Sequence, residues 1–213
     1  MTLRKARDLY PAKVGVVDGD RTFTYARIGE RVNSLARFFQ TRDIKPRDRI
    51  SILEVNSLAF LETYYAAAGI GAILNPLNYR LAPQEIAYIL RDSGSRWLVA
   101  GSRFASLVKG ILDEDTPLEG ILQIGDSPSF SEGITCYEYE NMIHSHAGIF
   151  EPVAIREDDV AHLYYTSGTT GRPKGVMLTH KNVCFHALGT IAELKLTDSD
   201  IWGHIAPMFH LAD

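Results

Sequence analysis

The residues with the greatest potential for chemistry lie in one continuous run, TSGTTGRPKG, from Thr166 to Gly175. Four side chains in it carry hydroxyl groups that can each donate a hydrogen bond to a phosphate oxygen: Thr166, Ser167, Thr169 and Thr170. Three glycines let the backbone turn tightly and come close to a ligand: Gly168, Gly171 and Gly175. Backbone N–H groups in such a loop can form an anion-binding concavity, and Lys174 adds a full positive charge. The run therefore predicts a loop that binds a polyphosphate.

Three well-known loops do not fit these letters. A Walker loop needs a glycine before its lysine, whereas Pro173 precedes Lys174. The dinucleotide fingerprint fails because the glycines are spaced by three and four. A nucleophile elbow needs a glycine two residues before its serine, where this chain has Tyr165, so a serine nucleophile is disfavoured. The plain alternative is a surface hairpin rich in small polar residues, but the length and order of the run favour the phosphate loop.

The loop lies between two predicted strands, 160–165 and 176–179, and a helix is predicted from about 180 to 194. Upstream, short apolar runs predict strands at 21–25, 49–55, 72–74, 96–100 and 120–124. Periodic apolar residues predict helices that begin near 25, 58 and 83, with further helices at about 103–112 and 136–146. Strands that alternate with helices predict an α/β fold with a mostly parallel sheet flanked by helices.

Local signals define several element ends. Ser57 is a candidate N-cap, Pro83 suits the first position of a helix, and Gly94 suits a left-handed helix end. The polar connector at 151–159 is the best candidate for a boundary between two layers or subdomains, and its alternative is an ordinary surface loop. His162 lies within a predicted strand, which favours a core or ladder histidine over a catalytic one.

The segment from Tyr165 to Val176 resembles the signature loop of the AMP-forming adenylating enzymes, which include acyl-CoA synthetases, peptide-synthetase adenylation domains and luciferases. Three other stretches resemble the same family: 22–25 (TFTY), 74–81 (LNPLNYRL) and 207–210 (PMFH). Within the family, the sequence is most similar to fatty or aryl acyl-CoA synthetases. The resemblance implies a partial N-terminal domain of an adenylate-forming enzyme.

The resemblance also implies roles. The β- and γ-phosphates of ATP, used with Mg²⁺, would be wrapped by Thr166, Ser167, Gly168, Thr169, Thr170, Gly171 and Lys174. The carboxylate of a small-molecule acid would attack the α-phosphorus to give acyl-AMP and pyrophosphate, and coenzyme A would then take the acyl group. Phe209 and His210 would lie near the substrate carboxylate or acyl chain. No residue of this chain is assigned a catalytic or metal-binding role.

In the family much more chain follows the Phe-His pair, including a Tyr-Gly-x-Thr-Glu segment and a C-terminal domain. Residues 1–213 are therefore expected to form an incomplete N-terminal AMP-binding domain that is inactive alone. The alternative is a non-catalytic nucleotide- or phosphate-binding fragment, or a scaffold. Apolar surface left exposed by the missing layers predicts self-association.

Composition limits the classes of protein and the cellular compartments that fit the chain. The chain has 213 residues, a net charge of −4 and 46% hydrophobic residues, so it is an ordinary globular sequence with no basic character for nucleic-acid binding. No apolar run approaches the roughly 20 residues of a membrane span, and the N-terminus is too polar for a signal peptide. Cys136 and Cys184 form neither a disulfide framework nor a zinc pattern, which favours a cytoplasmic location.

Overall fold

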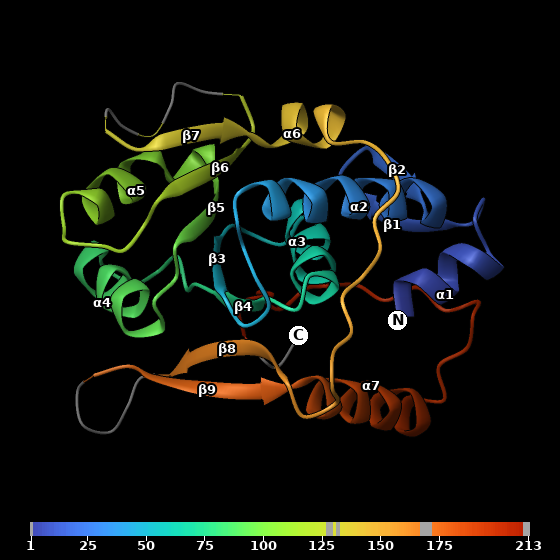
Figure 1. Cartoon of the computed structure of the whole chain (residues 1–213). Helices are drawn as coiled ribbons and strands as arrows, with labels where there is room; N and C mark the ends of the chain where they lie inside the picture. The colour runs from blue at the N-terminus through green and yellow to red at the C-terminus, as the bar shows by residue number, and fades with distance from the viewer. Residues whose placement is uncertain (1, 127–129, 131–132, 167–171, 211–213) are drawn as a thin grey trace.

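A computed structural model of the chain describes residues 2–126, 130, 133–166 and 172–210. It contains a seven-stranded sheet in the order β7-β6-β5-β3-β4-β8-β9 and a separate two-stranded sheet, β1-β2 (Figure 1). The strands are β1 (Val14–Asp18), β2 (Arg21–Thr24), β3 (Arg49–Leu53), β4 (Ile73–Pro76), β5 (Trp97–Gly101), β6 (Gly120–Ile124), β7 (Thr135–Glu138), β8 (Val160–Thr166) and β9 (Lys174–Thr179). The α-helices are α1 (Thr2–Leu9), α2 (Tyr25–Thr41), α3 (Leu58–Gly69), α4 (Pro83–Ser93), α5 (Ala105–Leu112), α6 (Tyr139–Ser145) and α7 (His180–Leu194).

The large sheet is parallel except at one edge. Strands β3 to β7 pair in parallel, and β8 joins β4 in parallel with Leu74 opposite His162. Strand β9 returns antiparallel to β8. The predicted α/β fold with a mostly parallel sheet is confirmed.

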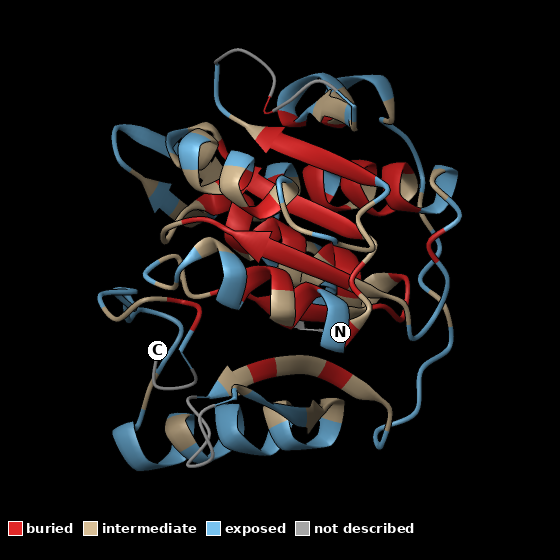
Figure 2. Ribbon diagram, turned by 90° about the vertical axis from the view of Figure 1, so that its left-hand side faces the viewer, coloured by how far each residue is buried: buried red, intermediate tan, exposed pale blue. Residues whose placement is uncertain are grey.

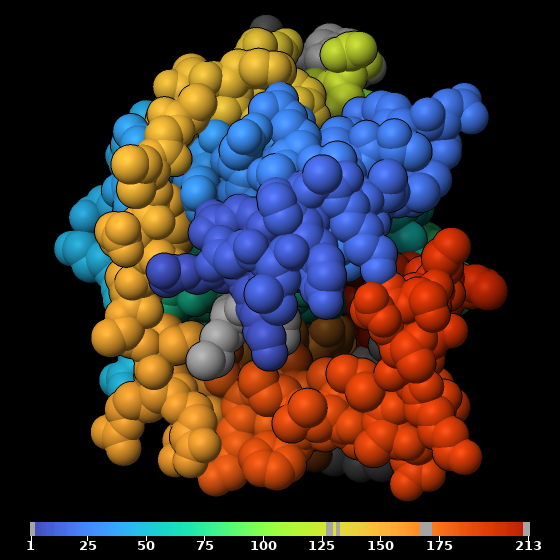
Figure 3. Space-filling model, turned by 90° about the vertical axis from the view of Figure 1, so that its right-hand side faces the viewer, coloured from blue at the N-terminus to red at the C-terminus, as the bar shows by residue number. Residues whose placement is uncertain are grey.

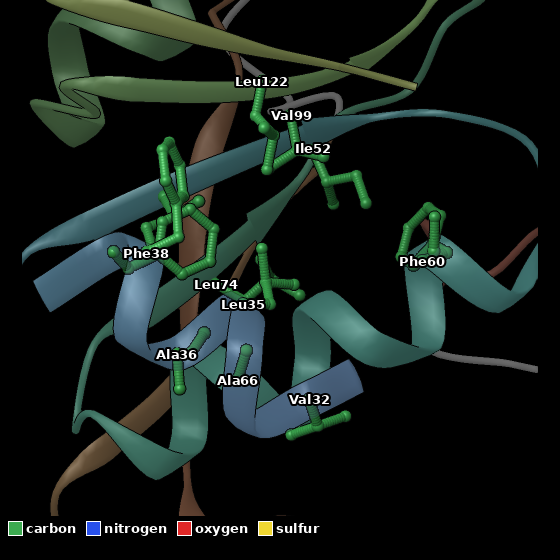
Figure 4. Close-up of a cluster of buried hydrophobic side chains, with 14 of the residues drawn as sticks. Val32, Leu35, Ala36, Phe38, Ile52, Phe60, Ala66, Leu74, Val99 and Leu122 are labelled. Carbon is green, nitrogen blue, oxygen red and sulfur yellow. The ribbon is translucent and has the colours of Figure 1, made fainter. Parts of the chain in front are cut away.

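Helices cover both faces of this sheet because successive strand residues point to opposite sides. On β5, Val99 belongs to the core beneath α2, α3 and α6, whereas its neighbour Leu98 belongs to the core beneath α4 and α5. Figure 4 shows Ile52, Val99 and Leu122, from three adjacent strands, together with the side chains of α2 and α3. Figure 2 shows that burial is concentrated in the central strands and the helices that cover them.

The predicted helix ends are confirmed. Ser57 accepts a hydrogen bond from the Phe60 N–H at 3.3 Å, and Pro83 occupies the first turn of α4. Gly94 ends α4 with a φ of 65°, in the left-handed region that glycine tolerates. The predicted helix at 136–146 is wrong at its start, because Thr135–Glu138 pairs with β6 as an edge strand and the helix begins only at Tyr139.

Helix α7 differs from the other long helices. None of its residues is buried, and its large apolar side chains are mostly exposed, with Phe185 at 64% and Leu188 at 61%. Figure 3 shows α7 and the segment that follows it as a layer along one side of the molecule. Among the described residues, no helix is long and apolar enough to cross a membrane.

Candidate functional site

The ends of the predicted phosphate loop are held by the hairpin of β8 and β9. Thr166 is the last residue of β8 and lies opposite Lys174, the first residue of β9, in the antiparallel ladder. Both are exposed to solvent, and Lys174 has no carboxylate partner among the described residues. The predicted strands on each side of the loop are thus confirmed. The intervening loop residues Ser167, Gly168, Thr169, Thr170 and Gly171 lie outside the described residues.

The geometry at this hairpin suits an anion. A lysine without a competing carboxylate keeps its full charge available, and the threonine opposite it offers a hydroxyl donor. Within the described part of the chain, no three His, Cys, Asp or Glu side chains gather as potential metal ligands.

The second predicted site segment, Pro207–His210, has both buried and exposed residues. Phe209 is only 5% exposed and packs edge-on against Tyr79, with ring centroids 5.0 Å apart. His210 is exposed, its ring centroid lies 4.5 Å from that of Phe209, and its N–H donates to the Pro207 carbonyl oxygen at 2.8 Å. Of the two residues predicted to lie near the substrate, His210 is exposed, whereas Phe209 is buried and packs against the ring of His210.

The sequence analysis missed the residues that fasten this segment to the sheet. Asn56 follows β3, and its side-chain amide bonds to the backbone of His204, Ala206 and Met208. Tyr64 on α3 donates its hydroxyl to the Met208 carbonyl oxygen at 2.9 Å. The available signal was the position of Asn56 directly after a buried strand of a parallel sheet, which is the edge where ligands of such sheets bind.

His162 behaves as the predicted ladder histidine. It lies on β8 opposite Leu74 of β4 and Leu178 of β9, and its ring meets that of Tyr64 at a centroid distance of 4.8 Å. Burial and the nearby His180 lower its pKa from 6.5 to about 4, so the ring is neutral at physiological pH. This supports a packing role for His162.

Comparison with known proteins identifies the family. The profile of the family described as "AMP-binding enzyme" matches residues 3–213. Crotonobetaine/carnitine–CoA ligase of Salmonella paratyphi B is 34% identical over 192 residues, which cover 90% of this chain and 37% of the relative. The chain thus spans little more than a third of the length of that curated relative.

Solved structures agree. An anthranilate CoA ligase in complex with anthranoyl-AMP is 26% identical with a TM-score of 0.81, over 87% of this chain and 35% of that one. O-Succinylbenzoate coenzyme A synthetase from Bacillus subtilis, in complex with ATP and magnesium ion, is 26% identical with a TM-score of 0.78, over 99% of this chain and 51% of that one. By its sequence profile and its fold, the chain belongs to the AMP-binding enzyme family.

Proposed function

We propose that the chain is the N-terminal part of an ATP-dependent acyl-CoA synthetase. The observation that carries the proposal is the placement of Thr166 and Lys174 opposite each other at the two ends of a run of hydroxyl and glycine residues, with the lysine exposed and without a carboxylate partner among the described residues. That arrangement favours the binding of the β- and γ-phosphates of ATP, to which Ser167, Gly168, Thr169, Thr170 and Gly171 would also contribute.

The reaction has two steps. An oxygen of the substrate carboxylate attacks the α-phosphorus of ATP, and the bond to pyrophosphate breaks, giving acyl-AMP. The thiol of coenzyme A then attacks the acyl carbonyl carbon, and AMP leaves. In the first step Lys174 would neutralise part of the charge that develops on pyrophosphate, and the loop hydroxyls would stabilise it by donating hydrogen bonds. Mg²⁺, when bound, would further neutralise the phosphates.

The proposed substrate is a fatty or aryl carboxylic acid, and the proposed location is the cytoplasm. The names of the relatives support a small carboxylic acid as substrate, because they include ligases for carnitine, anthranilate and O-succinylbenzoate. His210 is the residue proposed to lie near the substrate carboxylate, with Phe209 beneath it. Cys136 and Cys184 are both free thiols, which is consistent with a reducing compartment.

The test is ATP–pyrophosphate exchange with a panel of fatty and aryl acids, measured on the protein from its native source after its intact mass is known. Lys174→Ala should lower exchange on the order of 100-fold, because one charged donor to the leaving group is lost. Lys181→Ala is the matched control, since Lys181 is an exposed lysine at the start of α7, beyond the far end of β9, and pairs with Glu157. Equal activity of the two variants would contradict the proposed role of Lys174.

A chain of 213 residues without further sequence is proposed to be inactive in this assay. If the protein binds ATP or pyrophosphate but shows no ATP–pyrophosphate exchange under any condition, the second candidate is favoured, which is a non-catalytic phosphate-binding fragment. A chain that binds neither would favour a scaffold. Near-normal turnover by the 213-residue chain would overturn the proposal that it is inactive alone.

A further inference from the structure

A single side chain fastens most of the segment 204–208. Asn56 Nδ2 donates to the His204 carbonyl oxygen at 2.9 Å and to the Ala206 carbonyl oxygen at 2.7 Å. Asn56 Oδ1 accepts the Met208 N–H at 2.8 Å. Residues 201–210 form no helix or strand of their own, so these side-chain bonds replace the backbone pairing that a regular element would supply.

Tyr64 links this segment to the strand that leads into the phosphate loop. Its hydroxyl donates to the Met208 carbonyl oxygen at 2.9 Å and lies 2.6 Å from the hydroxyl oxygen of Tyr164. Because the one proton of Tyr64 goes to the carbonyl, the Tyr164 hydroxyl is the donor in the second bond. Tyr164 is 7% exposed and stands on β8, two residues before Thr166. The two hydroxyls thus join β8 to the backbone next to Phe209.

The ring of Tyr64 is itself fixed. It packs against Phe60 at a centroid distance of 5.4 Å and against His162 at 4.8 Å. Asn56 is fixed by its place between the end of β3 and Ser57, the N-cap of α3. Tyr64 thus belongs to a helix and Asn56 to the short link between β3 and α3, whereas the segment that they hold forms no regular element.

We propose that Asn56 and Tyr64 are positioning residues that hold the segment 204–210 in register with β8 and so fix His210 relative to Thr166 at the end of that strand. The proposal rests on the proposed function, in which the phosphate loop binds ATP and His210 lies near the acid. A displacement of about 1 Å between two reactants can cost on the order of 100-fold in rate. Residues that set such a distance should therefore affect the use of the acid even though they do not touch it.

The geometric part is tested by hydrogen–deuterium exchange on the 213-residue chain. Asn56→Leu removes the three bonds of Asn56 to the segment, and exchange at Met208 should accelerate about tenfold or more. Tyr64→Phe removes only the hydroxyl and should accelerate exchange in 204–210 by a smaller factor. Tyr137→Phe is the matched control, because it removes a hydroxyl that bonds Arg42 instead. Rates in 204–210 within twofold of the wild type in both anchor variants would overturn the proposal.

The functional part is tested by ATP–pyrophosphate exchange on the native protein. Tyr64→Phe should lower kcat/KM for the acid about tenfold while KM for ATP changes less than twofold, because the hairpin β8–β9 still holds the loop. Asn56→Gln keeps a side-chain amide with both a donor and an acceptor and should lose less activity than Asn56→Leu. A merely structural role would instead lower the amount of folded enzyme and leave both KM values unchanged, and that outcome would overturn the proposal.

The two hypotheses fail in different ways. If the wild type shows no exchange with any acid, the proposed function fails, and hydrogen–deuterium exchange still decides whether Asn56 and Tyr64 hold the segment. If the wild type is active and Tyr64→Phe matches it in kcat/KM for the acid, the positioning role fails while the proposed function stands.

Discussion

At the scale of single residues, His162 has an environment that determines its protonation. It lies on β8, which pairs with β4 and β9, and its ring contacts the rings of Tyr64 and Tyr164. Burial lowers its pKa to about 4, below the ordinary value of 6.5. As the pH falls, the ring is therefore protonated at a higher pH in the unfolded chain than in the folded chain. The histidine therefore contributes stability above pH 6.5 that is lost progressively as the pH falls toward 4.

The corresponding prediction compares His162→Phe with the wild type. Between pH 7 and pH 5 the free energy of unfolding of the wild type should fall by about 1–2 kcal/mol more than that of the variant, which has no titrating ring. Urea denaturation at the two pH values measures this difference. His186→Asn, at an exposed position of α7, is the control and should follow the wild type. A parallel loss of stability in His162→Phe would contradict the assignment.

Single residues were predictable from the sequence where their signal is local. The caps at Ser57 and Gly94 depend on neighbours within a few residues, and both predictions are confirmed. Asn56 could not be found in this way, because its partner Met208 is 152 residues away and only the fold brings them together. The loop residues Thr166 and Lys174 were recognised from their order alone, and their role in phosphate binding stays a prediction.

At the scale of elements, an ion-pair network fastens α6 to α2 and α3, and two of its members, Arg31 and Glu62, are buried. Arg31, 5% exposed, donates to Glu62 on α3 and, at 2.7 Å, to both carboxylate oxygens of Glu140 on α6. The Tyr139 hydroxyl also donates to Glu62, at 2.7 Å. Burial raises the pKa of Glu62, whereas the bond from Arg31 lowers that of Glu140. Each buried charge in the network depends on the others for its partners.

Removal of the central cation is predicted to be costly. Arg31→Met leaves Glu62, which is fully buried, without its guanidinium partner and should lower the free energy of unfolding by about 3–5 kcal/mol. Arg27→Met, on the same helix, removes an exposed pair with Glu30 and should cost less than about 1 kcal/mol. Urea denaturation at pH 7 compares the two variants. Similar costs for both would show that burial of the network does not determine its contribution.

Element prediction succeeded where apolar periodicity was strong and failed at the sheet edge. The central strands β3, β5 and β6 are almost wholly buried, and their apolar runs predicted them. Strand β7 has an exposed Thr135 and an exposed Glu138, so its sequence lacks that run and was merged into the helix that follows. The tertiary pairing with β6, which no local pattern encodes, determines its structure.

At the scale of the whole molecule, the apolar surface is unevenly distributed. Large apolar side chains are exposed together on β9, α7 and the segment after it, where Met177 is 67%, Phe185 64%, Leu188 61% and Ile201 97% exposed. A helix with apolar residues on more than one side is typical of a protein interior. Exposed apolar patches of this kind mark surfaces that pack against other polypeptide. The proposed subdomain boundary at 151–159 precedes this region, and it stays a prediction.

This surface predicts that the 213-residue chain self-associates in concentrated solution through β9 and α7. Leu188→Lys places a charge in the middle of the exposed face of α7 and should shift the chain toward monomer, because burial of an unpaired ammonium is unfavourable. Gln40→Lys makes the same change of charge at an exposed position of α2 and should leave association unchanged. Light scattering after size exclusion, over a range of protein concentrations, measures the average mass. A wild-type chain that stays near 23.7 kDa at every concentration would contradict the prediction, and association that Leu188→Lys does not weaken would assign it to a different surface.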